Sequence, residues 1–460
     1  MIQFKRQVAG LAISTLLFAI SAPVHSIGIL DAYSLALEKD PTFRAAIKEK
    51  EAGDENENIG RAGLLPKVSA NYQNSPRNWQ TQKSQQRESF FSDALTEVTK
   101  RQQYRSYSSS ITLTQPLFDY EAYARYKAGV AQTLMSDERY RSKYLDLAVR
   151  VISAYVEVAY SKDQIALASA QKAAYKEQLA LNDRLMSAGE GTITDVSETQ
   201  ARYSLAEAQE IEARDALDAA QRELEVIIGV PLDQLDELQV LRPGKFQVAP
   251  LIPSKFEEWQ KIALENNPML AASRHGVDAA KYEVERNRAG FMPQVQLYAS
   301  HSENDSSSDN TVNQKYRTDS IGVQVSVPIY AGGGVSASTR QAASRYGQAM
   351  YEMDAQVGTT LNDLRKQFNL CISSRAKLAA YELAVKSATT QVTATRQSVL
   401  AGQRVNVDVL NAEQQLYSAQ RDLASAKYTY IKSWITLLSD SGTLDEKDVK
   451  RVAQYFSMNR

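Results

Sequence analysis

Histidine and cysteine are few in this chain of 460 residues and lie far apart in the sequence, so histidine-based or metal-based catalysis has little material. The chain has three histidines, His25, His275 and His301, and one cysteine, Cys371. A single cysteine makes neither a disulfide framework nor a cysteine-rich metal site. The sequence shows no Ser-His-Asp set, phosphate-binding loop or metal-ligand spacing. It therefore predicts no catalytic residues, no metal and no cofactor, and a protein that is not an enzyme.

The charge balance argues against nucleic acid as a partner. The chain has 53 Lys and Arg residues against 54 Asp and Glu residues, a formal net charge of −1. Nucleic-acid-binding proteins usually carry a basic excess or a basic stripe. We therefore predict no nucleic-acid partner.

The first 26 residues are typical of a secretory signal peptide. Two basic residues precede an apolar stretch at Val8–Ile20, and small residues lead to a predicted cleavage before Ile27. An uncleaved anchor is the alternative, but the stretch is too short to span a bilayer as a helix. The residue directly after the predicted cleavage is Ile27 and not a cysteine, so a lipoprotein anchor is not expected. No later apolar run is long enough for a membrane-spanning helix, so we expect any membrane segment to consist of β-strands.

The remaining sequence contains two related halves. Arg61-Ala62-Gly63-Leu64-Leu65-Pro66-Lys67-Val68 returns as Arg288-Ala289-Gly290-Phe291-Met292-Pro293-Gln294-Val295. Ala188-Gly189, followed by Asp195-Val196, returns as Ala401-Gly402, followed by Asp408-Val409. A repeated unit suggests structural units arranged about an axis. We predict five segments: a signal peptide at 1–26, a first repeat at 27–228, a linker at 229–253, a second repeat at 254–438 and a C-terminal segment at 439–460.

Each half contains two segments with the alternation of β-strands. In the return strand of the second half, Ile321, Val323, Val325 and Val327 share one face, and small or polar residues share the other. This pattern is typical of a transmembrane strand, and it also fits a soluble sandwich. Four strands cannot close a barrel, and open edges are not tolerated in hydrocarbon, so membrane strands would require several chains. The predicted strands are about 66–74, 104–116, 293–301 and 316–328, with solvated polar loops at 74–103 and 302–313.

A helix is predicted from Asp31 to Gly60, before the first strand. Long helical hairpins are predicted at about 120–228 and 336–438. Their first arms run for roughly 65 residues without proline, about 100 Å of helix, a length that requires coiled-coil packing. Apolar residues in the last arm are spaced alternately by three and four, as in a heptad seam. The seam residues are Val409, Ala412, Leu416, Ala419, Leu423, Ala426 and Tyr430.

Together, the duplicated Arg-Ala-Gly-x-x-Pro-x-Val, the strand-ending prolines Pro116 and Pro328, and the repeated Ala-Gly turn make the chain resemble the TolC family of outer-membrane channel-tunnels. The resemblance covers essentially the whole mature length. It implies a mainly α fold with transmembrane β-strands, in which each chain repeats a helix-strand-strand-long helix-helix unit. It further implies a homotrimer with a 12-stranded β-barrel, a long α-helical coiled-coil barrel and a small mixed α/β equatorial region. We expect 229–253 and 439–460 in that region.

The resemblance also implies a passive exit duct in the outer membrane of a Gram-negative bacterium, with a periplasmic tunnel. Its expected partners are outer-membrane lipid, a periplasmic adaptor protein, an inner-membrane ABC transporter and an exported protein cargo. The chain looks most similar to the protease-secretion members, which implies type I protein secretion. A multidrug or solute efflux pump is the alternative. A periplasmic coiled-coil structural or adaptor protein is a third reading, which does not require the alternating strands.

Finally, the resemblance implies a gate at the helical tips, beside turns at Gly189 and Gly402. In similar proteins an arginine bonds to a Thr-Asp pair, and the matching residues here are Arg404, Thr194 and Asp195. Taken without the resemblance, these residues would be an exposed charge pair of little consequence.

Two acidic rings line the constriction in the family. Asp408 matches the first, whereas Asn411 replaces the second with a neutral ring. Val399 stands where the family has a locking tyrosine. We therefore expect an easily opened gate with mild cation preference.

Overall fold

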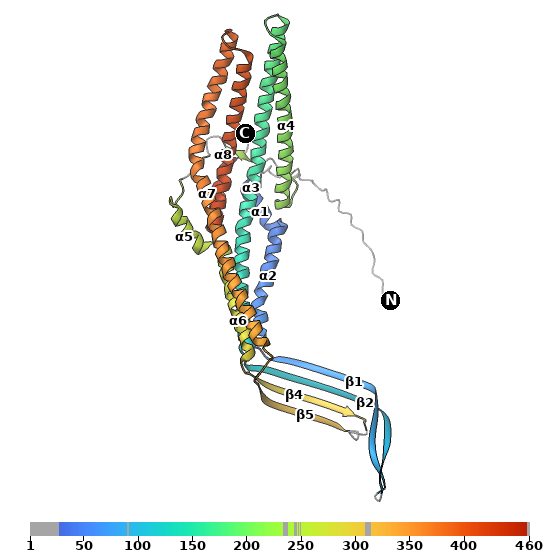
Figure 1. Ribbon diagram of the computed structural model, residues 1–460. Coiled ribbons are helices and arrows are strands. Elements are labelled where there is room, and N and C mark those ends of the chain that lie inside the picture. The colour runs from blue at the N-terminus through green and yellow to red at the C-terminus, as the bar shows by residue number, and fades with distance from the viewer. Residues whose placement is uncertain are drawn as a thin grey trace, which may run out of the picture.

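The computed structural model describes residues 27–457 except 90–91, 233–237, 243–245, 247, 249 and 309–313. The predicted signal peptide lies outside the described residues. Two helices, two strands and a long helical hairpin follow one another, and the order then repeats (Figure 1). The first set is α1 (Ile29–Lys39), α2 (Pro41–Ala62), β1 (Lys67–Ser89), β2 (Ser92–Phe118), α3 (Tyr120–Ser187) and α4 (Ile193–Ile228). The second set is α5 (Phe256–Asn266), α6 (Pro268–Arg288), β4 (Gln294–Ser306), β5 (Lys315–Ser326), α7 (Gly334–Leu400) and α8 (Asn406–Asp440). The short elements are β3 (Val240–Leu241), η2 (Ala289–Phe291), α9 (Glu446–Ala453) and β6 (Phe456–Ser457).

The opening helix is broken into α1 and α2, whereas the sequence predicted one helix from Asp31 to Gly60. Pro41 lacks a backbone donor and fits the first position of a new helix. Asp40 caps that helix by accepting hydrogen bonds from the backbone N–H groups of Thr42 (3.4 Å) and Phe43 (3.0 Å). The break therefore follows from a capping residue placed directly before a proline.

The long helices confirm the coiled-coil prediction. α3 has 68 residues and α7 has 67, and each folds back on a partner of about half that length, α4 or α8. All seven residues of the predicted heptad seam are buried or half-buried within the single chain. Both hairpin tips lie at one end of the molecule and the sheet lies at the other (Figure 1).

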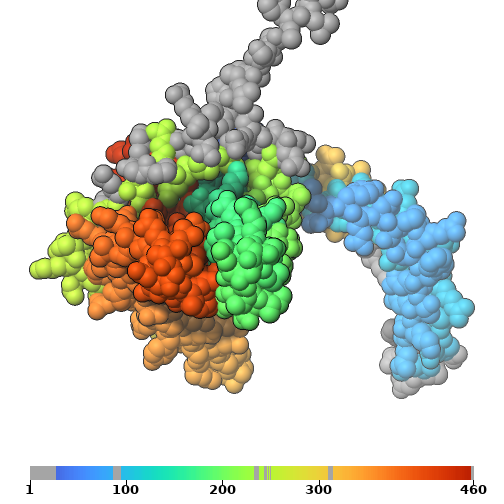
Figure 2. Space-filling view, turned by 90° about the horizontal axis from the view of Figure 1, so that it is seen from above, coloured from blue at the N-terminus to red at the C-terminus, as the bar shows by residue number. Residues whose placement is uncertain are grey.

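The four long strands form one antiparallel sheet in the order β1-β2-β4-β5. Pairing of Val68 with Leu113 and of Leu297 with Val323 places the alternating apolar residues of all four strands on one face. β1 and β5 are the edges of this sheet. In the view from above, the sheet extends well to one side of the helices (Figure 2).

The predicted polar loop at 74–103 is wrong. β1 and β2 continue through most of this stretch as a paired hairpin, from Asn78 opposite Tyr104 to Ser89 opposite Ser92. The stretch is rich in Ser, Gln and charge, which suggested a loop. Cross-strand backbone hydrogen bonds do not need an apolar face, so a polar sequence can still pair.

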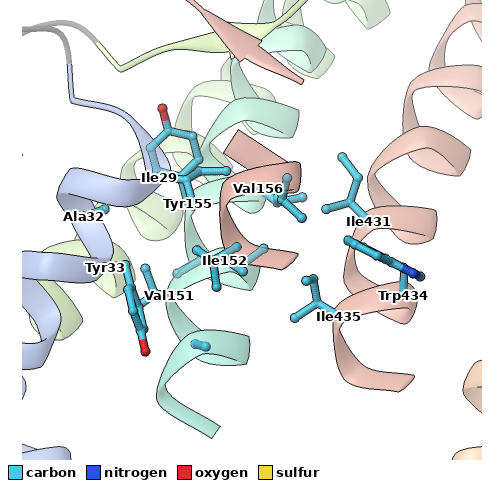
Figure 3. Packing of buried hydrophobic residues seen from close by; sticks show 14 of the residues in the cluster. Ile29, Ala32, Tyr33, Val151, Ile152, Tyr155, Val156, Ile431, Trp434 and Ile435 are labelled. Atoms are coloured by element: carbon cyan, nitrogen blue, oxygen red, sulfur yellow. The ribbon is translucent and has the colours of Figure 1, made fainter. Parts of the chain in front are cut away.

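The main apolar core lies midway along the helices. Figure 3 shows Ile29 of α1, Ile152 and Tyr155 of α3, and Ile431 and Ile435 of α8 pointing into one space. Each of these side chains is at most 1% exposed. Burying a side chain of this size contributes about 1.5–3 kcal/mol, so this core is the main attachment between the two hairpins.

The segment after α4 and the C-terminus meet beside this core. β3 pairs with β6 through Val240 opposite Ser457. The Tyr155 hydroxyl donates to the carbonyl oxygens of Ile27 (2.9 Å) and Gln239 (3.1 Å), which ties both segments to α3. The described parts of these two segments therefore lie beside the helices at mid-height.

In the part of the chain that the structure describes, no helix is both long enough and apolar enough to cross a membrane.

Candidate functional site at the helical tips

Each helical hairpin turns at a glycine with positive φ. Gly189 has φ +80° and Gly402 has φ +70°, a conformation that side-chain-bearing residues rarely adopt. Backbone bonds close both turns, from Glu190 N to Leu185 O and from Gln403 N to Ser398 O, both at 2.9 Å. The predicted turn residues are therefore where the sequence placed them, and the two tips share one geometry.

Asp195 is engaged in the cap of α4. Thr192 is the capping residue, and its hydroxyl donates to Asp195 Oδ2 at 2.6 Å. The Thr192 N–H donates to the same oxygen at 3.3 Å, and Asp195 N–H donates back to Thr192 Oγ1. This reciprocal arrangement fixes the carboxylate at the start of the helix. Both bonds use Oδ2, so Oδ1 remains available to another donor. The neighbouring Thr194 is exposed.

Arg404 and Asp408 lie on the other tip. Arg404 is exposed in the turn between α7 and α8. Asp408 is half-buried in the first turn of α8, where a negative charge is favoured by the helix dipole. Among the described residues of one chain, Arg404 makes no hydrogen bond or ion pair with Thr194 or Asp195. The predicted bond therefore stays a prediction.

A buried polar cluster joins the two hairpins just below the tips. Its centre is Thr199 of α4, which is fully buried. The side-chain amides of Asn182 on α3 and Asn406 on α8 donate to Thr199 Oγ1 at 2.8 and 3.1 Å, and Gln178 of α3 donates to Asn406 Oδ1 at 2.8 Å. We call these four residues the tip cluster. Sequence reasoning missed it, although the i, i+4 pair Gln178 and Asn182 would have shown a polar stripe on α3.

Asn411 also bridges the hairpins. Arg202 of α4 donates from Nη2 to Asn411 Oδ1 on α8 at 3.1 Å. Asn411 is exposed, so this bond is open to water. From the sequence, Asn411 was expected only to form a neutral ring, and its hydrogen bond to Arg202 within the chain was not predicted.

A charged pair holds α7 to α8 nearby. Arg396 bonds to Glu413, whose side chain is only 6% exposed. One carboxylate oxygen of Glu413 lacks a hydrogen-bond partner among the described atoms. Beside this pair lies a cleft of about 200 Å³ between α3 and the α7–α8 hairpin, and Val399 lines it. Arg396 is 46% exposed, so it is the loss of Arg396 that would leave a buried group, the Glu413 carboxylate, without its ion pair.

The described residues contain no group of three or more His, Cys, Asp or Glu side chains arranged to hold a metal ion. The chemistry that the tips offer is therefore hydrogen bonding, ion pairing and the placement of Asp408.

Comparison with known proteins identifies the family. The model of the family described as "Outer membrane efflux protein" matches residues 32–230 and 259–443. The chain belongs to this family. It is an outer-membrane protein, and the resemblance drawn from the repeated motifs is confirmed.

Two relatives are similar over nearly the whole chain. The chain is 50% identical to the alkaline protease secretion protein AprF of Pseudomonas aeruginosa, over 94% of this chain and 88% of that protein. It is 44% identical to the proteases secretion protein PrtF of Dickeya chrysanthemi, over 94% of this chain and 92% of that protein. Among solved structures, CusC matches with a TM-score of 0.76 and 17% identity, over 91% of this chain and 92% of that one. The last match supports the fold alone.

Proposed function

We propose that three copies of this chain form an outer-membrane exit duct of a type I protein secretion system. The observation that carries this proposal is the 50% identity, over 94% of the chain, to a protein named for alkaline protease secretion. A second protease secretion protein at 44% identity supports it. The cargo would be a protease or a similar exported protein. The role is transport, and no catalytic step is assigned to the chain.

The edges of the sheet support the trimer. β1 and β5 each present an unpaired edge, while one face of the sheet carries exposed apolar residues such as Val68, Val323 and Val325. In hydrocarbon an unpaired edge is costly, so β5 of one copy would pair with β1 of the next. Three copies of four strands would give a 12-stranded barrel, with the hairpins of the three copies forming a tunnel below it.

The helical tips would carry the gate. Arg404 of one copy would bond to Thr194 and Asp195 of a neighbouring copy, using the free Oδ1 of Asp195. Three Asp408 side chains would surround the axis, and the three Asn411 side chains one turn away would be neutral. An inner-membrane ABC transporter and a periplasmic adaptor would dock at this end.

Efflux of drugs or solutes is the second candidate. It is favoured by the description of the family itself, which names outer-membrane efflux. The outer-membrane assignment leaves no support for a periplasmic coiled-coil or adaptor role.

A deletion strain distinguishes the two candidates. We would compare its culture-supernatant proteins and its sensitivity to small toxic compounds with those of the parent and of a complemented strain. Loss of one or a few secreted proteins with unchanged sensitivity supports protein export. An unchanged supernatant together with increased sensitivity would reject protein export in favour of efflux.

A further inference from the structure

The β1–β2 hairpin extends beyond the four-stranded sheet. β4 pairs with β2 only as far as Ser306 opposite Ser106, whereas β1 and β2 stay paired to Ser89 opposite Ser92. An isolated two-stranded hairpin is only marginally stable in water. The extension is therefore expected to lie against another surface.

The base of the extension is fixed in direction. A register shift between Ser75 and Asn78 marks a bulge, and the hairpin bends there (Figure 1). The segment after β4 holds the other strand: Arg105 N–H donates to Ser307 Oγ, and Ser307 N–H donates to Arg105 O, both at 2.9 Å. These contacts orient the hairpin relative to the sheet.

One face of the extension continues the apolar face of the sheet. Side chains along a strand alternate between faces, so Arg105 and Arg101 share the face of Ile111. Trp79 lies on the same face because its partner is Gln103. Arg105 is about 20 Å along the strand from Ile111, at ~3.4 Å per residue. An arginine-tryptophan-arginine row therefore follows the apolar band.

The arginines of this row have no side-chain partner among the described residues. Trp79 is 77% exposed, and Arg77 in the bulge, Arg101 and Arg105 are also exposed. Among the described residues, none of these three guanidinium groups forms a hydrogen bond or an ion pair. The one carboxylate on the described side chains of β1 and β2, that of Glu97, is paired with another residue, Lys83. We call Arg77, Trp79, Arg101 and Arg105 the basic patch.

The other hairpin of the sheet differs at its far end. There Glu303 pairs with Lys315 at 3.1 Å and with Arg317 at 3.5 Å, and His301 contacts Asp319 at 2.6 Å. Its cations Lys315 and Arg317 are paired with Glu303, whereas the arginines of the basic patch form no ion pair with the side chains that the structure describes. Over the described residues, the two hairpins therefore differ in unpaired charge.

We propose that the basic patch binds the phosphate groups of lipid headgroups at the outer surface of the membrane. This inference rests on the proposed membrane barrel, in which the apolar face contacts hydrocarbon and the same face reaches headgroups further along. Arginine binds phosphate oxygens through two parallel hydrogen bonds. Tryptophan is favoured at a membrane–water interface. The headgroup layer would supply a surface for the face of the extension that carries the basic patch.

The test uses the detergent-solubilised full chain and lipid A, a glycolipid with two phosphates. We compare the wild type with the triple variant Arg77→Gln, Arg101→Gln and Arg105→Gln. A basic side chain near an anionic surface contributes about fivefold to binding, so the triple variant should bind about 100-fold more weakly. The matched control Arg317→Gln removes a cation that is already paired and should change binding less than about fivefold.

Three results would overturn the proposal: equal binding by the triple variant, equal binding of lipid A stripped of its phosphates, or displacement of lipid A by an equal concentration of inorganic phosphate. If the triple variant does not assemble, the single variants Arg101→Gln and Arg105→Gln should each weaken lipid A binding about fivefold, and unchanged binding in either variant would overturn the proposal.

Conductance in a planar bilayer separates the proposed exit duct from the proposed basic patch. A wild-type chain that binds lipid A but forms no channel would reject the duct alone, and a conducting triple variant with normal lipid binding would reject the patch alone.

Discussion

The two helical hairpins are joined in different ways at mid-height and at the tips. At mid-height, Ile152 of α3 and Ile431 and Ile435 of α8 are at most 1% exposed in a continuous apolar core. Near the tips, amide and hydroxyl groups centred on Thr199 join α3, α4 and α8, beside a small apolar cluster of Tyr175, Ala206 and Leu410. One protein thus uses apolar burial and polar bonding along the same pair of hairpins.

This difference indicates which part of the molecule can move. Separating an apolar core exposes its whole area to water, and the exposed side chains gain no new interaction that offsets the lost free energy. Separating hydrogen-bonded side chains exchanges them for water, and each bond contributes only about 0.5–1.5 kcal/mol net. We therefore expect the mid-height region to hold the hairpins together while the tips rearrange when the duct opens.

The largest expected effect comes from the apolar region. Ile152→Ala should lower the free energy of unfolding by about 2–5 kcal/mol, because it leaves a cavity in a fully buried site. Chemical denaturation in detergent measures this change. The control Ile152→Val should cost about 1 kcal/mol. A loss from Ile152→Ala no larger than that of the control would contradict the assigned role of this core.

A smaller effect on the free energy of unfolding is expected from Asp440, at the end of α8. Asp440 has a carboxylate oxygen that is buried without a hydrogen-bond partner among the described atoms. Burial, with a further contribution from the charge of Asp363, raises the pKa of Asp440 to about 7. A raised pKa favours the folded state at low pH, and this contribution is lost as the pH rises through about 7.

Asp440→Asn keeps the shape and removes the charge. The variant should be more stable than the wild type by about 2 kcal/mol at pH 8, with the gain shrinking as the pH falls toward 4. Melting curves over this pH range measure the difference. A gain of the same size at every pH would show that ionisation is not its cause.

Loss of hydrogen bonds in the tip cluster is expected to weaken the contact between the two hairpins by about 1 kcal/mol. Thr199→Val keeps the shape and removes the hydroxyl that accepts from Asn182 and Asn406. The variant should open more often in planar bilayers while its melting temperature changes little. Thr359→Val, on an exposed face of α7, is the matched control. Equal open fractions in the two variants would mean that the cluster does not hold the tips.

The smallest expected effect concerns ion selection. In the proposed trimer, three Asp408 side chains around the axis should attract cations, so Asp408→Asn should reduce block of the channel by multivalent cations several-fold. Loss of the charge at the start of α8 should lower stability by less than about 1 kcal/mol. Current recordings with and without the blocking ion test this. Unchanged block in the variant would remove Asp408 from the constriction.

Much of the fold is readable in the sequence because its signals are local. Glycine at positions 189 and 402, followed by a proline-free stretch with heptad spacing, predicts the hairpins, and alternating valines predict the second-repeat strands. The break at Pro41 was missed because the helical pattern on both sides is continuous. The long β1–β2 hairpin was missed because its residues are polar, and pairing depends on a partner strand that composition does not reveal.

The residues at the helical tips also differ in whether a local sequence pattern predicts them. The turns and the position of Asp408 follow from repeated motifs. The tip cluster joins Thr199 to Asn182 and Asn406, which come from three helices, and only the packing of the hairpins brings them together. The proposed contact of Arg404 with a neighbouring copy would depend on how the copies assemble, which no local pattern in the sequence reveals.

The most direct test of a duct closed by polar contacts at its tips is the single-channel conductance of Arg404→Ala in a planar bilayer. Arg404 lies exposed in its turn, so its removal should leave the fold intact. We predict a conductance several-fold above that of the wild type, because the contact between neighbouring tips is lost. A conductance equal to that of the wild type, in a variant that assembles normally, would contradict the account.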